Sequence, residues 1–159
     1  MKGCYARKEV KTIKEDEFLP WQKKAIDILR EEADDRKIYW FYSKAGGVGK
    51  TAFAKYCLVH EEGVMIADGS AKDIMNQVDM YMKNTGNPPR AVMFNLCRSV
   101  EDHVSYKAME ALKDGIGMNG KYEGGQIVMN PCHVFVLANC YPDATKMSDD
   151  RFVITCLDD

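Results

Sequence analysis

The chain has 159 residues, 46% of them hydrophobic, and a formal net charge of −2. This length and composition support one hydrophobic core and argue against a second full domain. The charge excludes a protein coated in basic surface, so any contact with nucleic acid is expected to come from a local lysine cluster.

Cysteine usage and the absence of long apolar runs indicate the compartment. The six cysteines stand at 4, 57, 97, 132, 140 and 156 and form no C-x-x-C pair, so neither disulfides nor structural zinc are supported. A reducing compartment is therefore expected. No apolar run approaches the ~20 residues that span a bilayer, and the first residues lack the apolar core of a signal peptide. We expect a soluble, intracellular protein without membrane contact.

The first 17 residues alternate in charge with little apolar periodicity, which predicts a flexible lead-in or linker over 1–17. Residues 18–159 are expected to form a single domain. Pro20 falls in the first turn of a predicted helix of about four turns. The apolar face of this helix is formed by Trp21, Ala25, Leu29 and Ala33.

Beyond this helix, short apolar runs alternate with amphipathic segments. Strands are predicted at 38–42, 64–67, 91–94, 133–138 and 151–156, and helices at 50–60, 70–84 and 104–113. Five glycines between 115 and 125 favour a β-hairpin there. The alternation predicts an α/β fold with a mostly parallel sheet flanked by helices. Ligands then bind beyond the carboxyl ends of the strands, where Lys50, Asn95 and Asn139 fall.

A glycine-rich turn separates the predicted strand 38–42 from the helix that follows it. It is made of Ala45, Gly46, Gly47, Val48, Gly49, Lys50 and Thr51. Backbone N–H groups of such a loop converge on a polyphosphate, Lys50 can reach the β- and γ-phosphates, and the Thr51 hydroxyl can ligate Mg²⁺. Lys44 stands where the G-x-x-x-x-G-K-[ST] pattern has its first glycine. The order of strand, loop and helix favours nucleoside triphosphate binding over the alternative, a glycine-rich loop that has no function.

Asn95 follows the predicted strand 91–94, where a P-loop ATPase usually has an acidic residue. An asparagine oxygen can accept a hydrogen bond from a metal-bound water, but it brings no negative charge and cannot act as a base. Glu101, Asp102 or Glu110 could supply the carboxylate instead. The alternative, that these three are solvated surface charges, stays open.

Two further polar residues stand near predicted strand ends. Asn139 follows the strand 133–138 and could orient an attacking water or sense the γ-phosphate, or it could simply form a turn. Arg151 could act in trans as an arginine finger on a neighbour's ATP. Its alternative is a surface salt bridge with Asp149 or Asp150.

A series of motifs follows in a fixed order along the chain. Its members are Trp21-Gln22, Arg36 to Trp40, Gly46 to Thr51, Phe94 to Arg98, Tyr106, Glu110, Leu112 to Gly115, Lys121 to Glu123, Ala138-Asn139, Pro142-Asp143 and Asp150 to Phe152. This order resembles the superfamily 3 helicase domain of replication-initiator (Rep) proteins of small circular single-stranded DNA viruses, the circovirus-like group. The resemblance covers roughly residues 19 to 155.

The resemblance implies a P-loop NTPase with an AAA+-like sheet and a DNA-contacting β-hairpin. Lys50 and Thr51 match the Walker A pair, and Asn95 stands at the Walker B position, with Thr51 and Asn95 toward the metal. Asn139 matches the motif C sensor and Arg151 the arginine finger. The implied activity is ATP hydrolysis with Mg²⁺, coupled to unwinding of DNA in rolling-circle replication.

The resemblance also implies partners and assembly. Lys121 and Tyr122 fall in the segment similar to motif B′, whose hairpin reaches into the channel of a ring. A lysine there can follow phosphates, and an aromatic ring can stack on bases of single-stranded DNA. The working form would be a homo-hexameric ring in the host cell nucleus. The chain has no H-x-H pair, so we do not expect it to nick DNA.

Two other functions compete with this interpretation. The first is a P-loop module that binds nucleotide and oligomerises, or serves as a DNA-binding scaffold, without appreciable hydrolysis; Asn95 favours it. The second is a superfamily 3 helicase that acts on RNA, since the hairpin gives no clue to the sugar.

Overall fold

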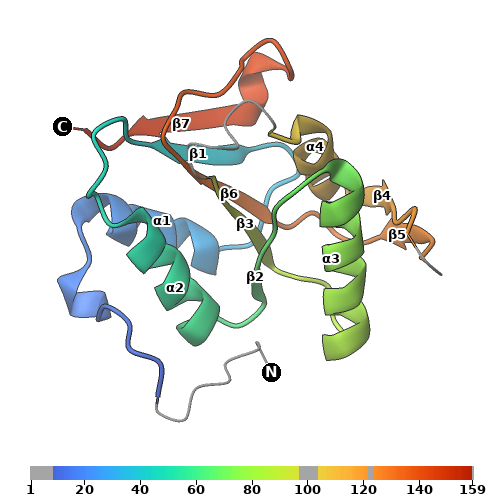
Figure 1. Cartoon of the computed structure of the whole chain (residues 1–159), viewed down its shortest axis with the longest axis horizontal. Helices are drawn as coiled ribbons and strands as arrows, with labels where there is room; N and C mark the ends of the chain where they lie inside the picture. Colours follow the sequence, from blue (N-terminus) through green and yellow to red (C-terminus); the bar gives the residue numbers. More distant parts are fainter. Residues whose placement is uncertain (1–8, 97–103, 122–123, 159) are drawn as a thin grey trace.

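Five parallel strands form the central sheet of the computed structural model, which describes residues 9–96, 104–121 and 124–158 (Figure 1). Neighbouring strands all pair in parallel. In their order across the sheet they are β2 (Val64–Ile66), β3 (Ala91–Asn95), β6 (His133–Ala138), β1 (Ile38–Tyr42) and β7 (Phe152–Cys156). The predicted α/β fold with a mostly parallel sheet is confirmed.

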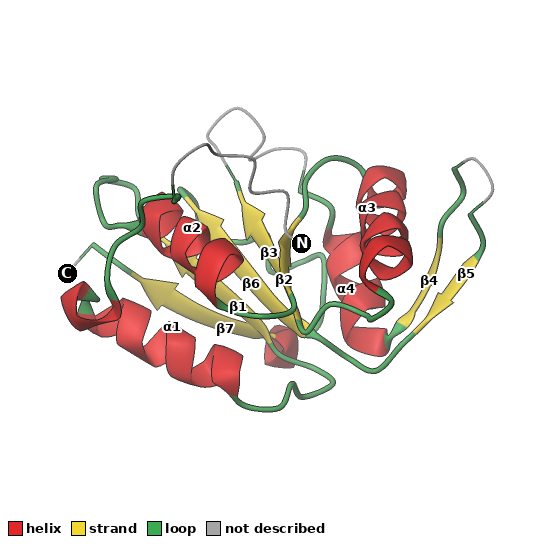
Figure 2. Ribbon diagram, turned by 90° about the horizontal axis from the view of Figure 1, so that it is seen from below, coloured by secondary structure: helices red, strands yellow, loops and turns green. Residues whose placement is uncertain are grey.

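Helices of the described ranges cover both faces of this sheet (Figures 1 and 2). One face carries α1 (Pro20–Arg30) and α2 (Lys50–His60). The other carries α3 (Ala71–Thr85) and α4 (Tyr106–Asp114). Short 3-10 helices, η1 (Glu15–Glu17) and η3 (Asp149–Arg151), precede α1 and β7.

The sheet divides the hydrophobic core into two layers because successive side chains of a strand point to opposite faces. Along β6, which is buried at every position, Val134 and Val136 pack under α3 and α4. Phe135 and Leu137 pack under α1 and α2 instead. This burial on both faces explains why the strand is apolar throughout rather than alternating.

Helix α1 is shorter than its apolar periodicity predicts. It ends at Arg30, and Glu31 is extended with φ −83° and ψ 166°, so Ala33 lies outside the helix. The carbonyl oxygen of Glu31 is 2.7 Å from Nε2 of His133 at the start of β6. A contact between distant segments therefore accompanies the end of the helix, and the prediction of about four turns is wrong.

The predicted glycine-rich hairpin is present beside α3 and α4, outside the central sheet (Figure 2). It consists of β4 (Ile116–Met118) and β5 (Gln126–Val128), which pair antiparallel. A Cβ on Gly117 would lie 2.6 Å from Sδ of Met75 in α3. Glycine therefore lets the hairpin approach α3 closely.

Part of the predicted lead-in packs against the domain. Ile13 contacts the core layer under α1 and α2. Glu15 pairs with Arg30 and accepts a hydrogen bond of 3.2 Å from the Tyr56 hydroxyl. These contacts fix residues 13 to 15 on the domain, whereas the boundary at residue 18 stays a prediction.

The described residues contain no group of three His, Cys, Asp or Glu side chains that could hold a metal ion. In the same residues Cys57 and Cys132 are buried, and Cys156 is exposed. Burial raises the pKa of the Cys132 thiol to about 12. Of the helices in the described ranges, none is both long and apolar enough to span a membrane.

Candidate functional site

The loop between β1 and α2 takes a conformation that requires glycine. Gly46, Gly47 and Gly49 have φ values of 79°, 69° and 82°, in the left-handed region that other residues rarely adopt. A Cβ on Gly46 or Gly47 would meet no atom within 4 Å, so the space over the loop is open. A Cβ on Gly49 would lie 2.7 Å from Nε2 of Gln22. The loop is thus open on one side and packed against α1 on the other.

The Lys50 ammonium group lies at the carboxyl ends of β1 and β6. Its Nζ is 2.6 Å from the carbonyl oxygen of Ala138, 2.9 Å from Oδ1 of Asn139 and 3.5 Å from the carbonyl oxygen of Ser43. All three acceptors follow or end a strand of the sheet. These three oxygens hold the ammonium group at the N-terminus of α2, where the helix dipole favours an anion.

Asn139 links this lysine to the end of β3. Since β6 lies between β1 and β3, Asn139, which follows β6, lies next to the end of β3 on one side and to the loop after β1 on the other. Its Nδ2 is 3.5 Å from the carbonyl oxygen of Leu96, the residue after Asn95. Asn95 itself ends β3 opposite Leu137 and is exposed. The structure therefore places Lys50, Asn95 and Asn139 along one edge, and Thr51 is exposed in the first turn of α2.

Two side chains of α1 donate hydrogen bonds to the backbone of the loop, a role that the sequence interpretation did not predict. Nε1 of Trp21 donates to the carbonyl oxygen of Val48 at 2.9 Å, and Nε2 of Gln22 donates to that of Gly49 at 3.0 Å. Gln22 is only 2% exposed. A glutamine on the buried side of an amphipathic helix was the available signal, because a buried amide needs a partner.

Arg151 lies at the amino ends of the parallel strands, whereas Lys50 lies at their carboxyl ends. It precedes β7, whose first residue pairs with the first residue of β1, whereas the loop follows the last residue of β1. Five residues of strand separate the two edges by roughly 15 Å. Its Nη2 is 3.0 Å from Oδ1 of Asp114, and its side chain is 8% exposed. The predicted surface pair with Asp149 or Asp150 is wrong: Arg151 is buried against Asp114, and Asp150 pairs with Arg36.

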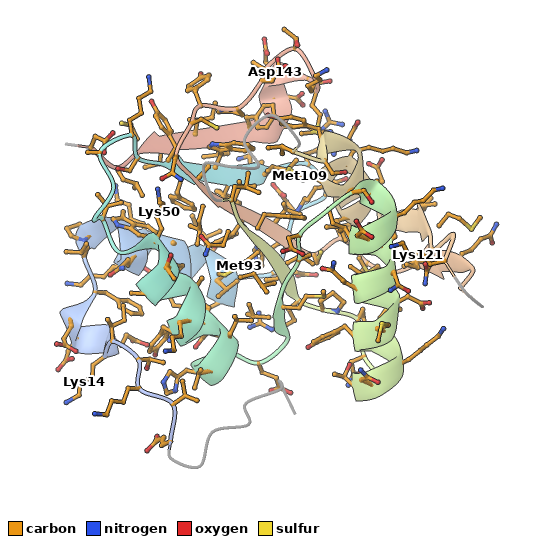
Figure 3. All side chains as sticks on the ribbon, in the orientation of Figure 1. Lys14, Lys50, Met93, Met109, Lys121 and Asp143 are labelled. Carbon is orange, nitrogen blue, oxygen red and sulfur yellow. The ribbon has the colours of Figure 1, made fainter. Side chains whose placement is uncertain are left out.

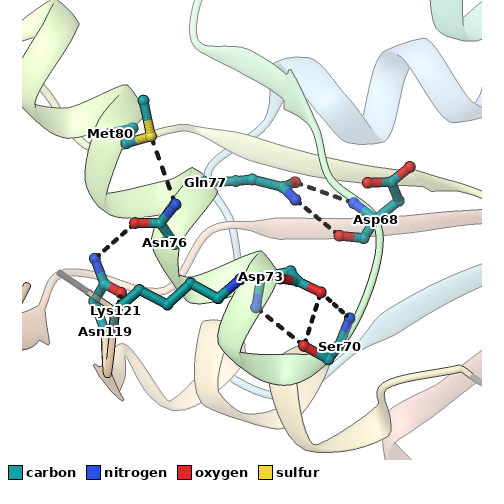
Figure 4. A network of polar contacts seen from close by, with 8 residues as sticks. All are labelled: Asp68, Ser70, Asp73, Asn76, Gln77, Met80, Asn119 and Lys121. Carbon is teal, nitrogen blue, oxygen red and sulfur yellow. Dashed lines mark hydrogen bonds and ion pairs between the residues drawn. The ribbon is translucent and has the colours of Figure 1, made fainter.

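Lys121 lies on the hairpin, away from Lys50 (Figure 3), and is docked on α3 (Figure 4). Its Nζ pairs with the Asp73 carboxylate, whose pKa is held well below its usual range by this contact and by hydrogen bonds from Ser70. Nearby, Nδ2 of Asn119 is 2.9 Å from Oδ2 of Asp79 and 3.1 Å from Oδ1 of Asn76.

Several predicted residues cannot be placed. Tyr122, Glu101 and Asp102 lie outside the described residues, while Glu110 lies within α4. The cation of the predicted DNA-contacting pair is therefore located, and its aromatic partner is not.

No protein-family model matches the chain. The sequence is 35% identical over 139 residues to Para-Rep C3 of Milk vetch dwarf C3 alphasatellite, covering 85% of this chain and 46% of that protein. It is 32% identical over 169 residues to Para-Rep C7 of Faba bean necrotic yellows C7 alphasatellite, covering 96% and 55%. Its homologues are Para-Rep proteins of alphasatellites. The chain spans about half the length of the Para-Reps it matches. The expected similarity to viral Rep proteins is confirmed at this level.

A solved structure shares the fold. The apo A form of the NrS-1 C-terminal region superposes with a TM-score of 0.51, covering 94% of this chain and 40% of that chain. At 14% identity this similarity concerns the fold alone. The Para-Rep homology and this structural similarity therefore bear on separate questions, descent and architecture.

Proposed function

We propose that the chain is an ATP-dependent DNA helicase domain of a viral replication-initiator protein, which translocates on single-stranded DNA in rolling-circle replication. The observation that supports it most is Lys50, which is held 2.9 Å from Asn139 beneath an open loop with three left-handed glycines. The homology to Para-Reps supports the replication context. The P-loop NTPase and AAA+ assignments, the homo-hexameric ring and the nuclear location belong to the same proposal.

The residues at this edge fit ATP and Mg²⁺. The open space over Gly46 and Gly47 leaves room for phosphates beside the backbone amides at the start of α2, where the helix dipole favours an anion. Thr51 and Asn95 offer oxygen atoms, the donor type that Mg²⁺ prefers, although neither side chain carries a charge. Mg²⁺ would neutralise phosphate charge during hydrolysis. Lys50 would exchange its carbonyl partners for phosphate oxygens, and Asn139 would orient a water.

Arg151 could serve only a neighbouring subunit. Its position at the far edge of the sheet excludes contact with the phosphates bound by its own Lys50. Its Nη1 is buried and makes no hydrogen bond with the described residues. To act as an arginine finger, the side chain would leave Asp114 and approach the ATP of the next subunit.

Asn95 favours one competing function, nucleotide binding and oligomerisation without appreciable hydrolysis. Strand β3 ends in Asn95, whose amide can neither act as the base for the attacking water nor give the metal a charged partner. Such a protein would act as a scaffold on DNA.

The assignment is tested by phosphate release from ATP with Mg²⁺. Lys50→Ala is expected to abolish hydrolysis and unwinding, because phosphate charge then lacks its cation. Lys55→Ala is a matched control, since Lys55 is exposed one turn further along α2. Wild-type activity in Lys50→Ala would refute the assignment.

The competing function is tested in the same assay with Asn95→Asp, with and without single-stranded DNA. Turnover by the wild type supports an enzyme, whereas turnover by Asn95→Asp alone would favour the scaffold. Single-stranded RNA in place of DNA separates the two helicase alternatives by strand preference.

A further inference from the structure

The Asp158 side chain contacts the beginning of the loop between β1 and α2. Its carboxylate accepts the hydroxyl hydrogen of Ser43, and its Oδ2 accepts the backbone N–H of Lys44 at 2.8 Å. Ser43 is completely buried. The loop is therefore tied to a residue that lies 115 positions further along the chain than Ser43.

The sheet itself brings Asp158 to this place. β7 pairs with β1 up to Cys156 opposite Tyr42, and the N–H of Leu157 then donates to the carbonyl oxygen of Tyr42 at 2.8 Å. Backbone pairing thus continues to the residue before Asp158. Because β7 runs parallel to β1, this pairing brings Asp158 to the end of β1 from which the loop begins.

Ser43 passes the contact on to the first left-handed glycine. Because its hydroxyl hydrogen goes to Asp158, its oxygen accepts the N–H of Gly46, at 3.0 Å. Hydrogen bonds from Ser43 and from the Lys44 N–H hold the pKa of Asp158 below its usual range. At neutral pH the carboxylate is ionised and can only accept, as both of its contacts require.

We propose that Asp158 is a positioning residue for nucleotide binding, whose carboxylate holds the loop in the open shape that phosphates enter. The inference rests on the proposed nucleotide-binding function. Asp158 contacts Ser43 and Lys44, before the glycines and before the first turn of α2, and Lys50 is close enough to help lower its pKa. This contact is also compatible with Lys44 in place of the first glycine of the G-x-x-x-x-G-K-[ST] pattern, because it uses only the backbone N–H of residue 44, which any residue except proline supplies.

The experiment compares the affinity for a fluorescent ATP analogue between the wild type and Asp158→Asn. Asparagine keeps the size of the side chain, but its NH₂ group would face either the Ser43 hydroxyl or the Lys44 N–H, and both of these groups donate. Since one of the two hydrogen bonds to the loop is then lost, we expect nucleotide binding to weaken about tenfold or more. Asp27→Asn, the same change at an exposed position of α1, is expected to leave the affinity unchanged.

Ser43→Ala distinguishes positioning from a general loss of stability. If Asp158 acts through Ser43, replacing Asp158 in the Ser43→Ala protein weakens binding less than it does in the wild type. Amide hydrogen exchange without nucleotide gives a second readout: the Lys44 N–H should be protected in the wild type and exchange faster in Asp158→Asn, while the amides of β1 keep their protection.

The outcomes separate this inference from the function on which it rests. Equal or tighter ATP binding by Asp158→Asn, with the wild type binding, would overturn the role of Asp158 and leave the nucleotide site standing. Absence of binding by the wild type would refute the proposed function and with it the inference. Unchanged exchange of the Lys44 N–H would refute the positioning contact whatever the affinity.

Discussion

Gly49 meets two requirements at once, because it caps α2 with a left-handed backbone and packs against Gln22. In Gly49→Ala the new Cβ would strain the backbone and lie 2.7 Å from the Gln22 amide. We expect the free energy of unfolding to fall by about 1–3 kcal/mol, and nucleotide binding to weaken as the loop shifts. Urea denaturation followed by circular dichroism measures the first effect.

Gly120→Ala is the control for this prediction, since a Cβ there would meet nothing within 4 Å. It is expected to leave the unfolding curve nearly unchanged. Equal stability of the two alanine variants would show that the left-handed backbone at Gly49 carries no strain.

His133 makes stability depend on pH near neutrality. Burial lowers its pKa, although the hydrogen bond to the Glu31 carbonyl opposes this. The unfolded chain therefore binds a proton before the folded chain does as the pH falls. Stability is complete above the unfolded pKa of about 6.5 and declines below it toward the folded pKa. The free energy of unfolding, measured between pH 5 and 8, should show this slope in the wild type and lose it in His133→Gln.

The placement of Lys50 and Asn139 beside each other could be predicted from the sequence, since parallel strands bring their carboxyl ends to one edge. Their role in phosphate chemistry stays a prediction. Asp158 could not be predicted as a loop contact, because aspartate occurs throughout surfaces and only the folded chain brings it to the loop. For Gln22 the buried side of the helix indicates that the amide needs a partner, but only the folded chain identifies the loop as that partner. Arg151 was identified by its motif, but its partner Asp114 depends on how α4 packs.

At the scale of elements, polar contacts hold the hairpin β4–β5 against α3 (Figure 4). The Asp73 carboxylate would compete with a DNA phosphate for Lys121 if the hairpin binds DNA as proposed. Asp73→Asn is therefore expected to raise the affinity for single-stranded DNA several-fold, as the charge that attracts Lys121 is removed. Fluorescence anisotropy with a labelled oligonucleotide at fixed salt checks this, because phosphate contacts weaken as salt rises.

Ser70→Ala controls for damage to the helix. Asp73 also accepts hydrogen bonds from Ser70 as part of the α3 cap, and Ser70→Ala weakens this cap without touching Lys121. A rise in DNA affinity in both variants would assign the effect to fraying of α3. No rise in Asp73→Asn would show that the ion pair does not restrain Lys121.

The elements themselves follow from apolar periodicity more reliably than their ends do. The predicted strands 38–42 and 133–138 and the helix 50–60 have the bounds observed for β1, β6 and α2. Helix α1 differs because its apolar pattern continues to Ala33, whereas the Glu31 carbonyl contacts His133 at 2.7 Å. Periodicity reports which face is apolar and contains no information about such a distant partner.

For the whole molecule, the proposed ring predicts that one active site needs two subunits. Arg151→Ala should still bind nucleotide but lose turnover, and Lys50→Ala should lose both. Mixing the two inactive proteins should restore part of the ATPase activity, because some sites then combine an intact Lys50 with an intact Arg151 from the next subunit.

Arg151 is buried against Asp114, so the folding of Arg151→Ala is checked first by thermal unfolding. Arg151→Lys is a second variant that keeps the charge and loses the planar fork of donors. Failure of every mixture, with both proteins folded, would argue against a site shared between subunits.

The direction of the strands in the sheet also constrains the proposed assembly. Since every strand runs the same way, the molecule has a carboxyl edge with Lys50 and an amino edge with Arg151, and these edges differ. A contact that joins one to the other can be a two-fold dimer only if both reciprocal contacts form in the same interface. If each interface holds one such contact, the assembly is head-to-tail, so it either closes on itself after a set number of copies or continues as a filament. The angle between successive copies decides between the two.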